Sequence, residues 1–212
     1  MLRLSQLAAC AAALALSTSA QPRPDKPLPL VGVYLDFESA PEAASVNVME
    51  HAVESLLSPA GIHVAWRSVR ENSGRETFSE LAVLKFKGRC QVRAPQPAND
   101  FGTLGEVNPL AFTAASSGHV LPYTEVECDQ VRKALAYISP GAGLLARQQA
   151  LGLALGRVVA HELYHILGNT AAHAEEGLAK ASEFLSDLVS NGPLTFDQGA
   201  ANLIRNHLRP EK

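Results

Sequence analysis

The chain has 212 residues, a formal net charge of −3 and 47% hydrophobic residues. This length and apolar content suit one domain with a substantial core, expected to act as a monomer. The slightly acidic balance and the lack of basic runs exclude a nucleic-acid-binding or anionic-membrane-binding class, and no stretch after the start is apolar for the roughly 18 residues of a membrane span.

The first 20 residues predict a signal peptide, with a basic start at Arg3, an apolar run from 7 to 16 and small residues up to 20. Cleavage there would give an exported protein, secreted or periplasmic. An alternative is a lipoprotein anchored at Cys10, because Leu7-Ala8-Ala9-Cys10 resembles a bacterial lipobox. Residues 21–30 are proline-rich and are predicted to form an extended tether, so the folded domain is expected over 31–212.

Two cysteines, Cys90 and Cys128, remain once the first 20 residues are removed. An isolated pair in an oxidising compartment is most simply one disulfide. Metal binding by this pair is disfavoured, since neither residue has a second cysteine or a histidine beside it.

The remaining elements follow from periodicity, with alternating β-rich segments indicating strands and apolar residues three and four apart indicating helices. In chain order, the sequence first predicts a strand at 31–37, a helix at 43–58, strands at 62–69 and 81–86, and a surface loop at 93–109. Extended segments at 111–115 and 120–127, a long helix from 142 and a closing helix at 195–208 follow. In the closing helix, the residues expected to face inward are Leu203, Ile204 and Leu208.

The functional signal lies in residues 161–173, His-Glu-Leu-Tyr-His-Ile-Leu-Gly-Asn-Thr-Ala-Ala-His. Four residues advance a helix by about 400°, so His161 and His165 project from one face and can grip one ion. Glu162 points toward the same side and can hold a water molecule against that ion. His173 follows a chain reversal and could supply a third nitrogen, leaving the open position that is typical of catalytic zinc.

The context favours a helix for this segment. Apolar Leu151, Leu155, Val158 and Val159 give the preceding residues a buried face. Gly168 stands where a left-handed cap would end the helix.

The segment resembles the metzincin zinc peptidases, whose pattern is His-Glu-x-x-His-x-x-Gly-x-x-His. His161, Glu162, His165 and Gly168 match, whereas Ala171 stands at the third histidine position and His173 comes two residues later. The family's methionine turn would fall on residues 177–180, which contain no methionine. The resemblance implies an α+β fold: a single metzincin-like catalytic domain with a small mixed twisted sheet, an N-terminal helix, a metal-binding helix and a C-terminal helix. It also implies an edge strand, near 111–120, that pairs with an extended peptide.

A second candidate for the third ligand remains open. Residues 182–187 resemble the glutamate-bearing helix of thermolysin-like peptidases, in which Glu183 would bind zinc and Asp187 would orient a histidine. Glu183 could equally be an acid in the first turn of a short helix capped by Ser182. His173 is the preferred ligand.

Together these residues predict a zinc-dependent peptidase that hydrolyses peptide or protein substrates through a zinc-bound water activated by Glu162. The metal ligands would be His161, His165 and His173. Two alternatives stay open, a secreted zinc-containing module that binds without turnover, and hydrolysis of an amide other than a peptide.

Overall fold

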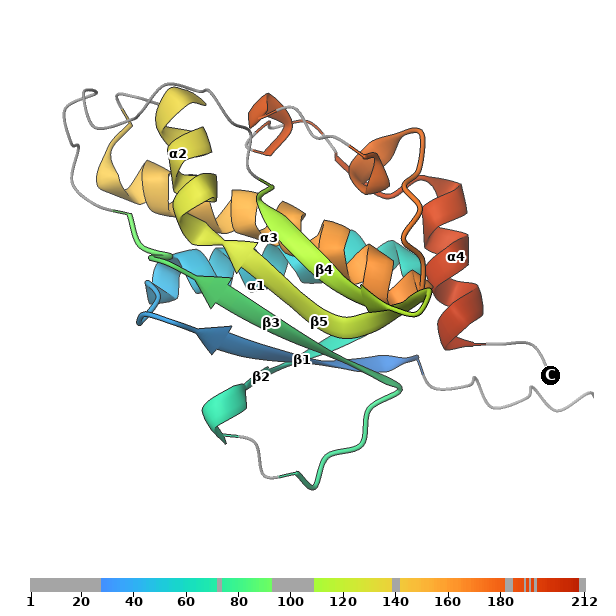
Figure 1. Ribbon diagram of the computed structural model, residues 1–212. Helices are drawn as coiled ribbons and strands as arrows, with labels where there is room; N and C mark the ends of the chain where they lie inside the picture. Colours follow the sequence, from blue (N-terminus) through green and yellow to red (C-terminus); the bar gives the residue numbers. More distant parts are fainter. Residues whose placement is uncertain are drawn as a thin grey trace, which may run out of the picture.

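The computed structural model describes residues 28–71, 74–92, 109–138, 142–181, 185–188, 190, 192 and 194–209. These residues form an α+β domain built on a five-stranded mixed sheet, as the sequence predicts (Figure 1). The elements are β1 (Leu30–Phe37), α1 (Ala43–Leu57), β2 (His63–Ser68), β3 (Glu80–Lys87), β4 (Ala111–Ser116), β5 (His119–Glu127), α2 (Cys128–Ile138), α3 (Leu144–Gly168) and α4 (Gln198–Leu208), with short 3₁₀ turns η1 (Ser58–Ala60), η2 (Val69–Glu71), η4 (Gly177–Ala179) and η5 (Leu185–Leu188).

The strands are ordered β2-β1-β3-β5-β4. The first four in this order are parallel, and β4 runs antiparallel to β5 at the edge of the sheet. Because β4 and β5 are joined by the tight turn at Ser117 and Gly118, both with positive φ, β4 folds back as a hairpin beside β5. The segment that the sequence proposes as an edge strand therefore occupies an edge.

Side-chain alternation divides the sheet into a buried and a solvent-facing side. On β3, Ala82, Leu84 and Phe86 are fully buried. The intervening Lys85 lies on the other side and pairs with Asp36 of β1 at 3.0 Å. Since successive side chains of a strand point to opposite faces, the buried set defines the face that the helices cover.

Helices α1 and α3 pack against each other on one face of the sheet (Figure 1). Two glycines of α3 allow their backbones to approach closely. A Cβ on Gly152 would lie 2.5 Å from Cβ of Val48, and one on Gly156 would lie 2.7 Å from Cβ of Ala52. The predicted buried face of α3, Leu151, Leu155, Val158 and Val159, is indeed buried, which fixes the rotation of the helix about its axis.

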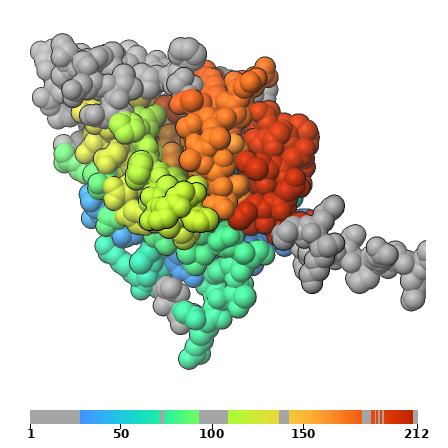
Figure 2. Space-filling view, turned by 45° about the vertical axis from the view of Figure 1, so that its right-hand side comes forward, coloured from blue at the N-terminus to red at the C-terminus, as the bar shows by residue number. Residues whose placement is uncertain are grey.

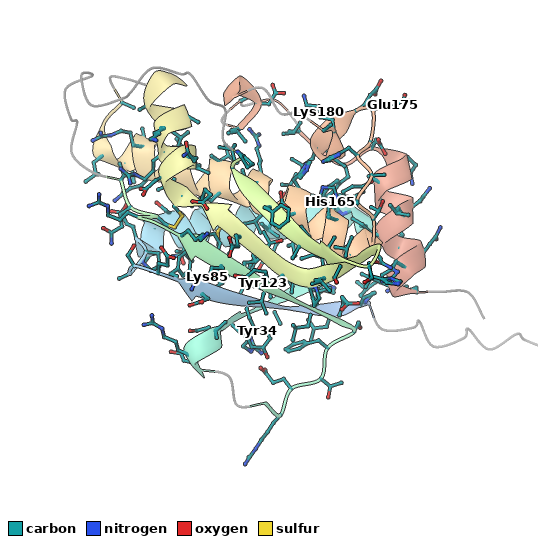
Figure 3. All side chains as sticks on the ribbon, in the orientation of Figure 1. Tyr34, Lys85, Tyr123, His165, Glu175 and Lys180 are labelled. Carbon is teal, nitrogen blue, oxygen red and sulfur yellow. A yellow bond between two sulfur atoms is a disulfide. The ribbon has the colours of Figure 1, made fainter. Side chains whose placement is uncertain are left out.

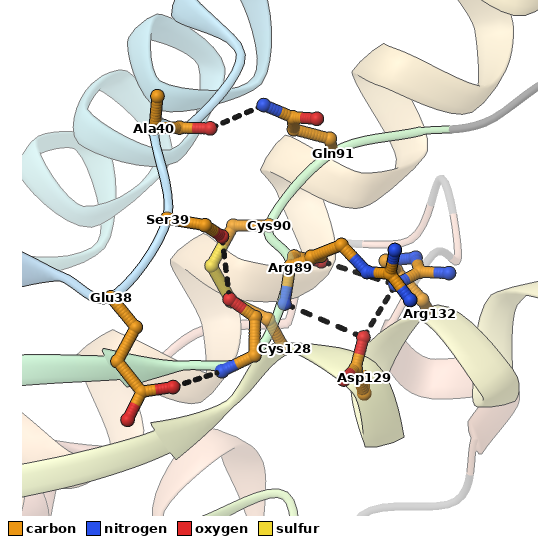
Figure 4. Close-up of a disulfide and its surroundings, with 10 residues drawn as sticks. Glu38, Ser39, Ala40, Arg89, Cys90, Gln91, Cys128, Asp129 and Arg132 are labelled. Carbon is orange, nitrogen blue, oxygen red and sulfur yellow. Dashed lines mark hydrogen bonds and ion pairs between the residues drawn. A yellow bond between two sulfur atoms is a disulfide. The ribbon is translucent and has the colours of Figure 1, made fainter.

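The predicted disulfide joins Cys90, which follows β3, to Cys128, which begins α2 (Figure 4). Both cysteines are buried. Around the bridge, Ser39 Oγ donates a hydrogen bond to the Gly88 carbonyl oxygen at 2.7 Å, and the Gly88 N–H donates to Glu38 at 2.8 Å. The bridge thus ties the segment that follows β3 to the start of α2.

Several expectations need correction. Helix α2 was not predicted, because it begins directly after β5 with no turn residue between them. Gly168 is still helical, and the left-handed cap is Asn169 (φ 44°), whose amide side chain tolerates that conformation. In α4, Ile204 is buried as expected. Leu203 is 37% exposed, although its side chain lies against Gly168 of α3.

The other boundaries agree closely with the sequence. Helix α4 begins at Gln198, later than the predicted Thr195, because the side chain of Asp197 caps it by accepting a hydrogen bond from the Ala200 N–H at 2.7 Å. The predicted signal peptide, most of the tether and nearly all of the loop at 93–109 lie outside the described residues. Among the described helices, none is both long and apolar enough to cross a bilayer.

Candidate metal centre

The last two turns of α3 carry the residues that the sequence selects for the site. His161, Glu162 and His165 lie where α3 passes beneath the β4–β5 hairpin, and Figure 3 shows His165 on this stretch of the helix. Glu162 and His165 are each only 7% exposed. The helix places them here because its buried apolar face leaves the histidine side directed toward β4.

The chain reverses direction immediately after the helix. The Asn169 N–H donates to the Ile166 carbonyl oxygen at 3.1 Å, and the Thr170 N–H donates to that of His165 at 3.0 Å. This reversal brings the carbonyl oxygen of Thr170 to 2.8 Å from Nδ1 of His165. The same turn that ends α3 therefore orients one of its histidines.

A second backbone carbonyl orients His161. Leu178, in η4, is fully buried, and its carbonyl oxygen lies 2.7 Å from Nδ1 of His161. The turn is held in place by the Leu178 N–H, which donates to the Thr195 carbonyl oxygen at 2.9 Å, and by the left-handed Gly177 (φ 71°). Residues 177–180, expected to occupy the position of a methionine turn, thus contact a candidate ligand through the backbone.

The third imidazole comes from the segment between these two turns. The ring centroid of His173 lies 4.7 Å from that of His165 and 5.3 Å from that of His161. One potential ligand atom from each of the three histidines lies within 4.8 Å of the others. The structure therefore brings His161, His165 and His173 together, despite the displaced position of His173 in the sequence.

The carbonyl contacts decide which ring nitrogens are free to bind a metal. A carbonyl oxygen only accepts hydrogen bonds, so Nδ1 of His161 and of His165 must each carry a proton. In the neutral imidazole the lone pair then resides on Nε2. The two Nε2 atoms lie 3.3 Å apart, and two facing lone pairs repel each other unless a cation lies between them. This donor set fits a divalent metal that prefers imidazole nitrogen.

Burial further supports neutral imidazoles. It lowers the pKa of His161 and His165, because the protonated ring loses solvation, and the carbonyl contact with Leu178 or Thr170 only partly opposes this effect. Both rings therefore favour the neutral form that a metal requires.

Glu162 lies beside the imidazoles in a different environment. Burial raises the pKa of Glu162, while hydrogen bonding to Thr113 and the nearby His165 and His173 counteract this rise. The Thr113 hydroxyl, on β4, donates a hydrogen bond to Glu162 Oε2. The Thr113 hydroxyl oxygen also lies 2.6 Å from that of Thr124, on β5.

The three histidines and Glu162 line one cleft with a volume of about 450 Å³. Its apolar walls come mainly from β4 and the residues before it, and from the segment after α3. In Figure 2, β4 (lime) lies directly beside the segment that follows α3 (orange). Lys180 also lines the cleft, with its Nζ 2.7 Å from Asp187 Oδ2.

The thermolysin-like alternative finds no support from Asp187. The carboxylate of Asp187 pairs with Lys180, whereas backbone carbonyls occupy the histidine Nδ1 positions where an orienting acid would act. Glu183 lies outside the described residues. Glu175 and Glu176 are exposed acids in the loop after α3 (Figure 3 labels Glu175).

Other histidines stay away from this centre. His51, His63, His119 and His207 are exposed and do not line the cleft. Sequence reasoning did not find Thr113 or Thr124, because a threonine on a strand carries no motif of its own.

No family model matches the chain, and no curated protein matches it. Among solved structures, the chain is similar to the crystal structure of archaemetzincin from Methanopyrus kandleri. The two chains share 12% sequence identity over 87% of this chain and 98% of that chain, with a TM-score of 0.48. A likeness this distant assigns no function to the chain.

Proposed function

We propose that the protein is a zinc-dependent peptidase. The observation that carries this proposal is the meeting of three imidazoles and a buried carboxylate, Glu162, in one cleft bordered by an edge strand. A site with three histidine ligands leaves a coordination position for substrate chemistry, whereas a structural zinc site is closed by a fourth protein ligand.

His161, His165 and His173 would hold the metal. Neutral imidazoles suit zinc, copper, iron and nickel, and zinc is the usual choice where no redox chemistry is needed. When bound, zinc would supply a Lewis acid that polarises the scissile carbonyl and makes a water molecule more acidic. The carbonyls of Leu178 and Thr170 would keep both helix-borne rings in the ligating tautomer.

Glu162 would act as the general base. Its burial opposes ionisation, but the Thr113 hydroxyl and the neighbouring imidazoles favour the carboxylate that a base requires. It would accept a proton from the attacking water and later pass that proton to the leaving amine. This dual use needs a carboxylate beside both reacting groups, and the presence of Glu162 in the cleft wall supports such a role.

The edge strand gives the substrate a backbone partner. One side of β4 pairs with β5, and among the described strands none pairs with its other side. An extended peptide can add to such an edge through main-chain hydrogen bonds, with alternate side chains reaching the cleft. Since Ala111, Phe112 and Thr113 line the cleft, a peptide paired here would lie next to Glu162.

The cysteine bridge supports an oxidising compartment for this activity. We therefore propose that the peptidase works outside the cytoplasm, consistent with the predicted signal peptide.

The test is cleavage of an unstructured protein such as casein by the purified chain, combined with metal analysis. Expected are about one equivalent of zinc per chain, cleavage that a chelator abolishes, and recovery of cleavage when zinc is returned. Tightly bound zinc without cleavage of casein or of a peptide library would overturn the proposal and favour a non-catalytic zinc module.

A further inference from the structure

The contact between Thr113 and Glu162 joins two distant parts of the chain. Thr113 lies on the edge strand, 49 residues before Glu162, and its hydroxyl donates to Oε2 of that carboxylate. The pairing of β4 with β5 shifts register between Thr113 and Ala115. Such an irregularity re-aims side chains locally, and here it follows the residue that contacts the candidate base.

The direction of the hydroxyl protons follows from counting donors. An ionised carboxylate only accepts hydrogen bonds, so the single hydroxyl proton of Thr113 is committed to Glu162. The 2.6 Å contact between the Thr113 and Thr124 hydroxyl oxygens then requires Thr124 to be the donor. The chain of hydrogen bonds therefore runs from Thr124 to Thr113 to Glu162.

Burial makes this chain of hydrogen bonds a fixed one. Thr124 is fully buried and Glu162 is 7% exposed, so little water competes for either group. Successive hydrogen bonds in such surroundings strengthen one another. Because a carboxylate is planar, holding Oε2 also fixes the direction of Oε1 relative to the three imidazoles.

We propose that Thr113, anchored by Thr124, is a positioning residue that holds Oε2 of Glu162 so that Oε1 is the oxygen that exchanges a proton with water and the leaving amine. This inference rests on the proposed peptidase function. Thr113 belongs to the strand expected to pair with substrate, so the same strand would align the peptide and the base. General-base catalysis is sensitive to such alignment, since a displacement of about 1 Å can reduce the rate by about a hundredfold.

The activity test compares variants that differ by one hydroxyl. Thr113→Val keeps the side-chain shape but removes the donor, and we expect kcat to fall by about 10-fold to 100-fold with little change in KM and full zinc content. Thr113→Ser restores the hydroxyl and should recover most of kcat. Thr124→Val leaves the Thr113 hydroxyl without its anchor and should reduce kcat less. Ser116→Ala, on the same strand but outside the cleft, is the matched control and should behave as wild type.

A second readout needs neither metal nor turnover. In metal-free protein labelled with ¹³C-glutamate, the Glu162 carboxyl resonance is identified by its loss in Glu162→Gln. At one fixed pH, we expect this resonance to shift in Thr113→Val and to return toward its wild-type position in Thr113→Ser. Should Thr113→Val fail to fold, kcat and the Glu162 resonance are measured for Thr124→Val in its place.

The outcomes separate this inference from the proposed function. The wild-type protein could fail to cleave casein while the Glu162 resonance still shifts in Thr113→Val. That result would overturn the proposed peptidase function but support the contact by which Thr113 positions Glu162. If the enzyme is active but neither kcat nor the Glu162 resonance changes in Thr113→Val, the peptidase function is not overturned but the positioning role of Thr113 is. Thr113→Ser as impaired as Thr113→Val would also overturn it, because the hydroxyl would then not be what matters.

Discussion

The Nε2 atoms of His161 and His165 lie 3.3 Å apart, while the Nδ1 atom of each ring faces a backbone carbonyl oxygen. This relationship sets both the tautomer and the direction of the two rings. With His173 close to both, the three imidazoles form a group that could hold a metal ion.

Replacing Glu162 by Gln should separate metal binding from catalysis. The amide has nearly the shape of the carboxylate but cannot accept the proton, so we expect zinc content to stay unchanged and kcat to fall by about 10²- to 10⁴-fold. Steady-state cleavage and metal analysis of the same preparation measure both quantities. Glu176→Gln, an exposed acid nearby in sequence, is the control. A fully active Glu162→Gln protein would refute the assigned role.

His173→Ala should weaken zinc binding far more than Glu183→Ala does. Losing a direct ligand should exceed the 10- to 100-fold loss of affinity, roughly, that accompanies removal of an orienting partner. Competition with a chromogenic chelator measures the two affinities. Zinc at about 100 times the dissociation constant should stabilise the wild-type fold by about 2.7 kcal/mol, and this gain should shrink in His173→Ala. The opposite ranking of the two variants would favour the thermolysin-like ligand set.

Removal of the bridge, through the double change Cys90→Ala and Cys128→Ala, should lower the free energy of unfolding. The bridge spans 38 residues, for which the chain-entropy account gives about 3–4 kcal/mol. Denaturant titration of the variant and of oxidised wild type gives the difference. A loss below about 0.5 kcal/mol, the range of neutral surface changes, would contradict this expectation.

Gly152→Ala should destabilise the contact between α1 and α3. An added Cβ would lie 2.6 Å from the Ser45 carbonyl oxygen, so the backbone of α1 would have to move. Overpacking of this kind costs about 1–3 kcal/mol, which exceeds the helix propensity of about 1 kcal/mol gained by Ala. Gly143→Ala is the steric control, because nothing lies within 4 Å of the added atom. Gly143 is the N-cap of α3, so this change only weakens the cap slightly. Thermal unfolding should therefore show a much larger drop in midpoint for Gly152→Ala than for Gly143→Ala.

The sequence predicted what depends on short-range periodicity. Helical spacing alone places His161 and His165 on one face of α3, and alternation locates β1 and β3 to within one residue at each end. Helix α2 was missed although Val131 and Ala134 are buried on one side of it, because no glycine or proline separates it from β5.

Contacts between distant segments could not be predicted in the same way. Thr113 and Glu162 are 49 residues apart, and only the sheet order brings them together. The proximity of His173 depends on where the chain goes after Asn169, which residue spacing does not determine. The prediction that Leu203 faces inward was wrong for a similar reason, because its neighbour, Gly168, belongs to another helix, α3.

The oxygens that steer His161 and His165 belong to the main chain, and every amino acid carries such an oxygen. The amino acids at positions 170 and 178 could therefore differ between related proteins without changing the orientation of these imidazoles. An insertion or deletion between 165 and 178 would displace the oxygens at once, so evolution should conserve loop length here more strictly than residue identity.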